Sequence, residues 1–146
     1  MLFSDGSLCT VLYRMMRASR RCGLGILAAV VYKLNAFLTG AVIGRSAEFG
    51  PGLIILHSVG VVVNTSVRGG CNVIIEGGVT IGAEKGRSPV LGDNVYIGSG
   101  AKVIGGVKVG NDVRIGANAV VVKDVPDEAT AVGVPARIVR TRVQER

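Results

Sequence analysis

The sequence is poor in aromatic and charged residues. It has no tryptophan, its aromatic residues amount to 4%, and charged residues make up only 18% against 49% hydrophobic residues. That hydrophobic content excludes a disordered chain, and the length of 146 residues fits one domain. The formal net charge is +7, but few aromatic side chains are available for base stacking and no recognition motif is present. We therefore expect no nucleic-acid partner.

Cysteine and histidine are also scarce. The three cysteines, Cys9, Cys22 and Cys71, are odd in number and too irregularly spaced for a disulfide framework or a zinc site, which favours a cytoplasmic location. The apolar run that begins at Cys22 is interrupted at Lys33, so it is too short for a membrane-spanning helix of about 20 residues. Arginines precede this run as in a signal peptide, but no small-residue cleavage site follows it.

Glycine, by contrast, is abundant, with 22 residues, and apolar residues recur at a spacing of six. The series consists of Ile43, Phe49, Ile55, Val61, Val67, Val73, Val79, Leu91, Ile97, Val103, Val109, Ile115 and Val121. Six residues make one short strand and one turn, and three such units make a triangular coil of about 18 residues. The repeated side chain would point inward and stack on its copy in the next coil. Glycines that follow it would allow the corners their unusual backbone angles.

Several longer stretches carry a family resemblance, namely residues 56–64, 78–82, 92–101 and 123–137, the last of which ends in AVGVPAR. The sequence resembles the hexapeptide-repeat acyltransferases over about residues 41–140, and most of all the serine acetyltransferase-like branch. This resemblance implies an all-β left-handed parallel β-helix over 41–140 that uses acetyl-CoA as acyl donor, with no metal. It also implies a homotrimer.

The first forty residues do not follow the repeat. Two stripes of apolar residues at helical spacing, with arginines interleaved in the first, predict a short α-helical cap over the open end of the β-helix. A weak contact of this basic segment with a membrane surface stays open as the alternative. At the other end, residues 141–146 form a basic tail.

The repeat is broken at residues 82–90, where Lys85 stands in place of an apolar residue. We expect a loop extruded from the coil there. The resemblance implies that this loop reaches the active site at a subunit boundary.

The single histidine, His57, matches the catalytic histidine of the family. Acyl transfer from a thioester to a hydroxyl requires a base that works near neutral pH, and imidazole suits this role. We expect direct transfer, because no second histidine exists to activate Cys71 as an acyl-carrying nucleophile. The β-helical carbonic anhydrases are excluded, since they need three histidines on zinc.

Two departures from the serine acetyltransferase pattern affect the acceptor. The family has Asp fifteen residues before the histidine and commonly Asp directly before it, where this chain has Val42 and Leu56. A backbone carbonyl, Glu76 or Glu84 would then orient His57. The acceptor is therefore either serine or a sugar or polysaccharide precursor.

The resemblance also implies a donor site. Ser99 and Ala117 would line the groove for the pantetheine arm, and Lys123, Arg137 and Arg140 would contact the phosphates of coenzyme A. The leading hypothesis is an acetyl-CoA-dependent O-acetyltransferase. A non-catalytic β-helix scaffold that uses the same coils for assembly is the alternative.

Overall fold

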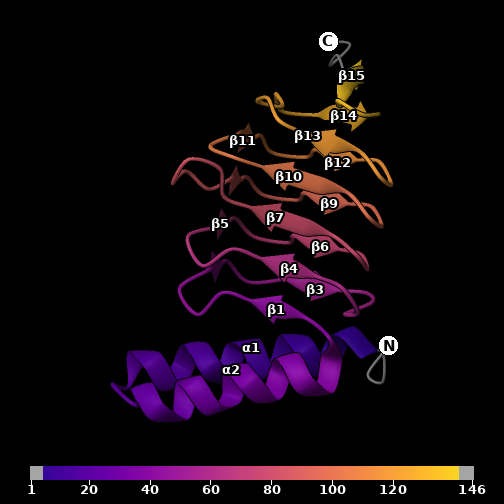
Figure 1. Cartoon of the computed structure of the whole chain (residues 1–146). Helices are drawn as coiled ribbons and strands as arrows, with labels where there is room; N and C mark the ends of the chain where they lie inside the picture. Colours follow the sequence, from indigo (N-terminus) through magenta and orange to yellow (C-terminus); the bar gives the residue numbers. More distant parts are fainter. Residues whose placement is uncertain (1–4, 142–146) are drawn as a thin grey trace.

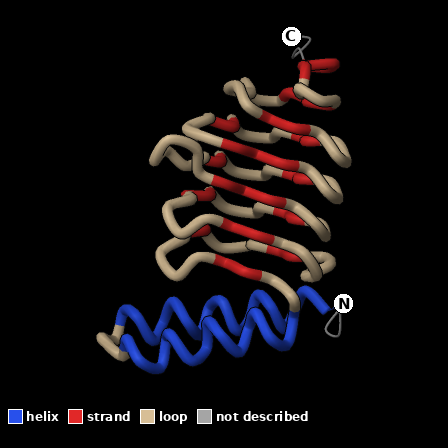
Figure 2. Tube along the Cα trace, viewed as in Figure 1, coloured by secondary structure: helices blue, strands red, loops and turns tan. Residues whose placement is uncertain are grey.

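A computed structural model of the chain describes residues 5–141, and these form a three-sided β-solenoid that stands on two helices (Figure 1). The helices are α1 (Asp5–Arg21) and α2 (Gly25–Thr39), which run antiparallel across the base. The solenoid rises from them, so that the described ends of the chain lie at opposite ends of the molecule (Figure 2).

Short strands stack in parallel into three faces. Face A consists of β1 (Val42–Ile43), β4 (Val62–Val63), β7 (Thr80–Gly82), β10 (Lys102–Ile104) and β13 (Val120–Val121). Face B consists of β2 (Glu48–Phe49), β5 (Arg68–Gly69), β8 (Val90–Leu91) and β11 (Lys108–Val109). Face C consists of β3 (Ile54–Ile55), β6 (Ile74–Ile75), β9 (Tyr96–Ile97), β12 (Arg114–Ile115) and β14 (Ala129–Val132), with β15 (Arg137–Thr141) antiparallel to β14.

The interior of the solenoid is a column of β-branched and alanine side chains. Val61, Val73, Ile81 and Ile97 have no exposed surface, and each such burial contributes about 1.5–3 kcal/mol. The repeat predicted from the sequence therefore marks the core.

The coils do not all have the expected uniform length. Val42 pairs with Val62, 20 residues on, whereas Val62 pairs with Thr80, 18 residues on, and Arg68 pairs with Val90, 22 residues on. The 20-residue coil has two extra residues in the corner that contains His57, and the 22-residue coils contain four extra residues in the 82–90 loop. The interpretation of Lys85 as occupying a repeat position was thus wrong, because those four residues are an insertion.

The inserted loop is a tight hairpin. Glu84 and Arg87 exchange two backbone hydrogen bonds of 2.9 and 3.0 Å, and Lys85 and Gly86 between them have φ of 50° and 75°. The two backbone hydrogen bonds close the turn, so the inserted residues form an ordered hairpin and not a flexible linker.

Helix α1 closes the base of the solenoid, as the cap prediction requires. On all three faces, N–H groups of one coil donate to carbonyls of the coil above, so these carbonyls point toward the base, and those of the first coil have no coil beneath them. Arg14 donates to the carbonyls of Phe49 and Gly50 at 3.1 and 2.6 Å, and the Tyr13 hydroxyl donates to the carbonyl of Ala47 at 2.9 Å. The side chains of α1 thus satisfy acceptors that would otherwise lack partners.

Candidate active site

The corner that joins face C to face A is formed by residues 56–61, 76–79, 98–101 and 116–119, which we call the glycine corner. Gly60, Gly78 and Gly100 occupy equivalent positions in successive coils, with φ of 69–73°. A Cβ atom on Gly78 would lie 3.6 Å from the Cα of Gly100, so a side chain there would extend along the corner toward the next coil. The glycines leave an open surface that rises along the solenoid as far as Asn118, which occupies the next equivalent position and whose side chain lies against Gly100.

His57 lies at the lower end of this corner, two residues after the end of β3, and its side chain is exposed. Gly77 in the coil above leaves room for it, because a Cβ atom on Gly77 would lie 3.2 Å from the Cβ of His57. Within the part of the chain that the structure describes, the imidazole has no hydrogen-bond partner. It is therefore free to bond to a substrate.

The cap holds the corner of His57 in place. The buried hydroxyl of Ser58 donates to the carbonyl of Thr39 at the end of α2, at 2.7 Å. Asn35, one turn earlier in α2, donates to the carbonyl of Cys9 in α1 at 3.3 Å. Gly6 packs so closely on the carbonyl of Ile55 that a Cβ atom there would lie 1.6 Å from it. The widened corner is thus fixed from below by both helices.

Above His57, the carboxylate of Glu76 is held by three donors. The hydroxyls of Tyr96 and Ser99 both donate to it, and the backbone N–H of Ser99 donates at 3.2 Å. These bonds, led by that of the Ser99 hydroxyl, lower the pKa of Glu76, and the charge of His57 lowers it further. The guanidinium of Arg114 lies over the Tyr96 ring, 4.6 Å from its centroid. Glu76 therefore remains ionised beside the candidate base.

The structure brings most of the expected site residues to this corner. Exposed Ser99 and Ala117 lie on successive coils above His57, where the backbone N–H of Asn118 bonds to the carbonyl of Ser99 at 2.8 Å. Arg137 begins β15, directly after the 133–136 turn at the top of the same corner. Arg140 belongs to β15 as well, but its side chain and residues 142–146 lie outside what the structure describes.

Three of the expected groups lie elsewhere. Lys123 and the 82–90 loop, with Glu84, belong to the corner that joins face A to face B, so within one chain they are separated from His57 by face A. Of the two carboxylates considered for orienting His57, only Glu76 shares its corner. Among the described residues, no group of three or more His, Cys, Asp or Glu side chains could hold a metal ion.

Comparisons with known proteins place the chain among serine acetyltransferases. A family model described as bacterial transferase hexapeptide (six repeats) matches residues 88–123. Serine acetyltransferase of Helicobacter pylori strain J99 is 44% identical over 131 residues, which cover 87% of this chain and 77% of that protein. These matches confirm the resemblance found in the sequence.

Solved structures agree. The crystal structure of Neisseria gonorrhoeae serine acetyltransferase superposes with a TM-score of 0.91 at 33% identity, covering 98% of this chain and 58% of that one. A serine acetyltransferase in complex with CoA superposes with a TM-score of 0.88 at 36% identity, covering 94% of this chain and 58% of that one. The left-handed parallel β-helix with a helical cap is thereby confirmed. This chain spans a little over half the length of these solved relatives.

Proposed function

Because the chain belongs to the serine acetyltransferase family, we propose that it transfers the acetyl group of acetyl-CoA to a hydroxyl of a small acceptor, with His57 as general base. The observation that carries the proposal is the glycine corner. It places His57, Ser99 and Ala117 on one open surface, with Arg137 at its upper end. Such a surface suits a long, thin donor that ends in phosphates.

The reaction needs no covalent enzyme intermediate. His57 takes the proton of the acceptor hydroxyl, and the oxygen attacks the thioester carbonyl. A tetrahedral oxyanion forms, which backbone N–H groups of the corner would stabilise. When the C–S bond breaks, the proton on His57 passes to the leaving thiolate. The base is thereby restored and the acetyl group is on the acceptor oxygen.

Glu76 would support the base. The imidazolium that forms during transfer lies within the electrostatic influence of this carboxylate. Tyr96 and Ser99 each donate to one oxygen of the carboxylate, and among the described residues no hydrogen bond joins Glu76 to His57, so Glu76 would act through its charge and not as a hydrogen-bonding orienter.

For the acceptor, we propose serine as the first candidate to test. The names of the relatives point to serine, whereas Val42 and Leu56 remove two carboxylates that the sequence comparison associates with the family site. A sugar or polysaccharide precursor needs no partner for an ammonium group and is the second candidate. The test is thiol release from acetyl-CoA over a panel of hydroxyl acceptors. Serine and sugars should differ clearly in the rate of thiol release that they support. No thiol release with any acceptor would contradict the proposed activity.

For the donor, we propose that Arg137 and Arg140 contact the phosphates of coenzyme A. Guanidinium groups bind phosphate oxygens through paired donors. Replacing both by Ala should weaken coenzyme A binding by about 2–4 kcal/mol, at about 1–2 kcal/mol for each contact. Calorimetric titration with coenzyme A and dephospho-coenzyme A tests whether the 3′-phosphate is their target. Equal losses for the two ligands would reject that assignment.

We further propose a homotrimer in the cytoplasm. The loop corner of one chain, with the 82–90 hairpin and Lys123, would then meet the glycine corner of the next and complete the site. In a closed cyclic trimer, every chain uses both of these surfaces, so none is left without a partner. Sedimentation equilibrium measures the mass directly, and a stable monomer at micromolar concentration would contradict the shared site. A scaffold without activity would show no thermal shift with coenzyme A.

A further inference from the structure

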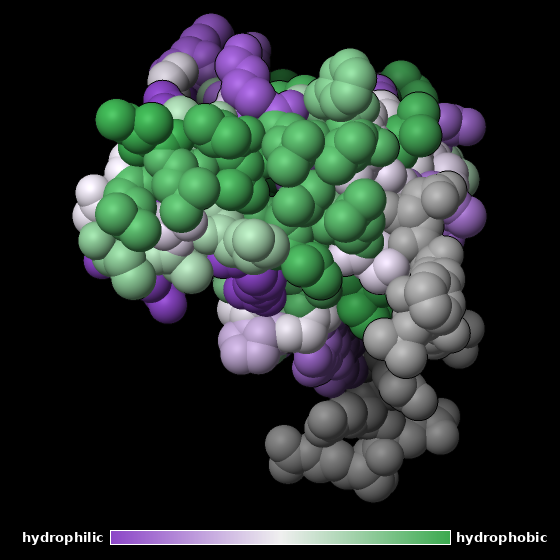
Figure 3. All heavy atoms as spheres, turned by 90° about the horizontal axis from the view of Figure 1, so that it is seen from below, coloured by the Kyte–Doolittle hydropathy of each residue, from purple (hydrophilic) through white to green (hydrophobic). Residues whose placement is uncertain are grey.

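The outer surface of the helical cap is apolar. Seen from below, hydrophobic side chains form a continuous patch over both helices, with hydrophilic groups at its margins (Figure 3). Ile26 and Phe37 of α2 are 85% and 86% exposed, and Val30 is 57% exposed. We call this surface the basal face; its other members are Leu8, Val11, Met15, Leu24, Leu27, Leu34 and Leu38. Patches of this kind mark interaction sites.

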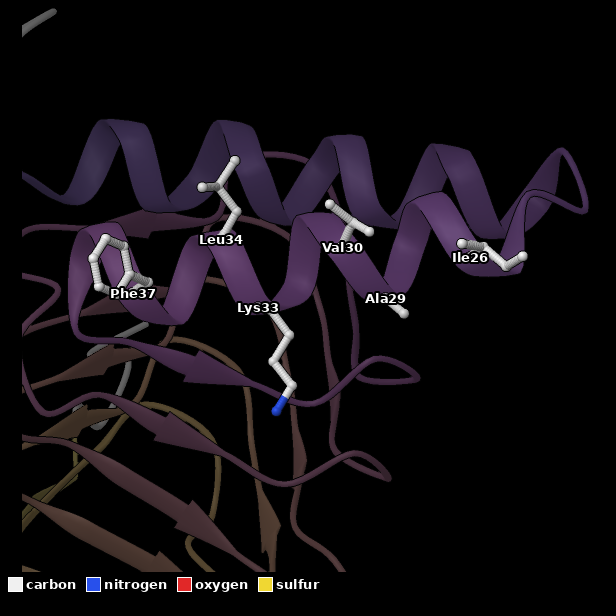
Figure 4. Close-up of a pocket in the computed structure, with 6 residues that line it drawn as sticks. All are labelled: Ile26, Ala29, Val30, Lys33, Leu34 and Phe37. Carbon is white, nitrogen blue, oxygen red and sulfur yellow. The ribbon is translucent and has the colours of Figure 1, made fainter.

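This apolar character is not needed for the cap itself. The solenoid and α1 are contacted by the opposite side of α2, where Ala28, Val31, Asn35 and Thr39 are buried. Ile26, Val30, Leu34 and Phe37 border a shallow hollow of about 530 Å³ on the outer side (Figure 4). A helix that is apolar on both sides normally has both sides covered. Among the described residues, nothing covers the outer side.

Positive charge surrounds the basal face. Between residues 6 and 47 the sequence contains basic residues and no acidic one. Lys33 borders the hollow but extends away from the basal face, toward the strands (Figure 4). At the turn between the helices, a second hollow of about 410 Å³ is lined by Arg17, Arg20, Arg21, Arg45, Arg68 and Glu48. Glu48 is shared by Arg17 and Arg68, at 3.5 and 3.8 Å. One carboxylate thus faces five guanidinium groups.

From this arrangement we infer that the basal face binds an anionic lipid bilayer, with its apolar side chains in the outer acyl region and the arginines at the phosphate level. The heights agree. Arg17 and Arg20 donate to carbonyls of the first coil, so they lie about one helix diameter, about 10 Å, above the basal face. Interfacial helices bury their apolar face by about 5–10 Å, which leaves the basic groups among the headgroups.

Charge argues against a second copy as the occupant. A second basal face in contact would supply no acidic partner for the basic residues, because residues 6–47 contain no acidic residue. An anionic bilayer instead attracts each basic residue near its surface. No helix among residues 5–141 is long and apolar enough to cross a membrane.

Flotation of the full chain with vesicles tests the inference. Equimolar phosphatidylcholine and phosphatidylglycerol should bind the protein, phosphatidylcholine alone should not, and high salt should release it. Ile26→Ser with Phe37→Ser should weaken binding at least about tenfold, because these exposed side chains supply the inserted area. The matched control, Val62→Ser with Val122→Ser, removes exposed valines from face A and its edge and should bind as the wild type does.

A second pair isolates charge. Arg21→Gln with Lys33→Gln should weaken binding about tenfold to thirtyfold, at about fivefold for each cation near the surface. Lys85→Gln with Lys108→Gln, on the solenoid, should have little effect. Circular dichroism checks that each variant is folded.

Three results would overturn the inference: equal binding to both vesicle types, no binding by folded wild type, or no loss in the Ile26 and Phe37 variant. If the free protein forms a larger assembly that this variant dissociates, without vesicle binding, the occupant is a second copy. None of these measurements uses acetyl transfer, so they are independent of the proposed activity.

Discussion

Two corners of the solenoid face the same backbone requirement and meet it with different residues. In the glycine corner, the three lower left-handed positions are Gly60, Gly78 and Gly100, and the uppermost is Asn118. In the corner that joins face B to face C, which we call the asparagine corner, the first coil has Gly52, and the matching positions above it are Asn72, Asn94, Asp112 and Glu128, with φ of 55–56°. Both types of residue tolerate positive φ, glycine because it lacks a Cβ atom and asparagine because its short side chain bonds locally.

The consequence is chemical. In the asparagine corner the amide of Asn72 donates to Asn94 and that of Asn94 donates to Asp112, each at 3.0 Å, so the side chains bond to one another. In the glycine corner no side chain occupies the three lower positions, and only the uppermost carries one, that of Asn118. His57, Ser99 and Ala117 border this corner. One corner is closed by a ladder that stabilises the stack, and the other is left open for a ligand in the coils below Asn118.

The largest expected effect is the loss of the base in the open corner. His57→Ala should lower acetyl transfer by about 10²–10⁴-fold, the usual contribution of a positioned base. Coenzyme A binding and the melting temperature should hardly change, because the imidazole is exposed and has no hydrogen-bond partner among the described residues. Thiol-release kinetics with calorimetric titration measure both. A variant that keeps more than half the wild-type turnover would disprove the assignment.

Gly78→Asn converts the open corner to the residue of the closed one. Asparagine accepts the φ of 69°, so the fold should persist, but its side chain would extend toward Gly100 across the proposed donor surface. We expect coenzyme A affinity to fall at least about tenfold, or about 1.4 kcal/mol. Calorimetric titration of the folded variant with coenzyme A is the measurement. Unchanged affinity would show that the donor does not bind across this corner.

The reverse change is Asn94→Gly. It removes two side-chain hydrogen bonds from the asparagine ladder while it keeps a residue suited to positive φ. The free energy of unfolding should decrease by about 1 kcal/mol. Acetyl transfer should stay at the wild-type rate, since this corner is remote from His57. Urea denaturation and the thiol-release assay report the two effects. Reduced turnover at full stability would contradict the claim that the asparagine corner serves stability and not acetyl transfer.

The fold could be predicted from the sequence because the core repeats. Each inward position must be apolar, and each corner needs a residue that tolerates its backbone, so both constraints recur at short, regular distances. The exact coil lengths were harder. Ile55 and Val61 are six apart and seem to continue the series, yet Ile55 ends one strand and Val61 precedes the next across a widened corner. The coil length can be read from the pairs of inward apolar residues, two apart, that mark each strand. The pair Leu53 and Ile55 is followed by Val61 and Val63, eight residues on instead of six.

The site was predictable in part. The resemblance to the family pointed to His57, Ser99 and Ala117, and stacking brings them to one corner. It could not reveal the contacts of Glu76 with Tyr96 and Ser99, because these residues lie in successive coils and no local spacing links them. The same holds for the anchoring of Ser58 by Thr39, which depends on where α2 ends. Contacts between coils follow from the exact coil lengths, which the six-residue series concealed.

The smallest expected effect concerns the Glu76 cluster. Glu76→Gln keeps the shape but replaces an oxygen that accepts hydrogen bonds with an amide nitrogen that cannot. The free energy of unfolding at neutral pH should fall by about 0.5 kcal/mol, since solvent screens this partly exposed group.

The difference in unfolding free energy between this variant and the wild type should depend on pH in both the acid and the alkaline range. The bonds from Ser99 and Tyr96 lower the pKa of Glu76, so their stabilisation exists above the unfolded carboxyl value of about 4.3 and is lost as pH falls through the folded value. The bond to Glu76 raises the pKa of Tyr96, so its stabilisation exists below the unfolded phenol value of about 10 and is lost as pH rises further. Urea denaturation across this range should therefore give a difference that is largest between the two limits and shrinks toward both. Tyr96→Phe is the control, because it should abolish the alkaline decrease while the Ser99 contribution keeps the acid one, and a difference that does not change with pH would show that the cluster does not form in solution.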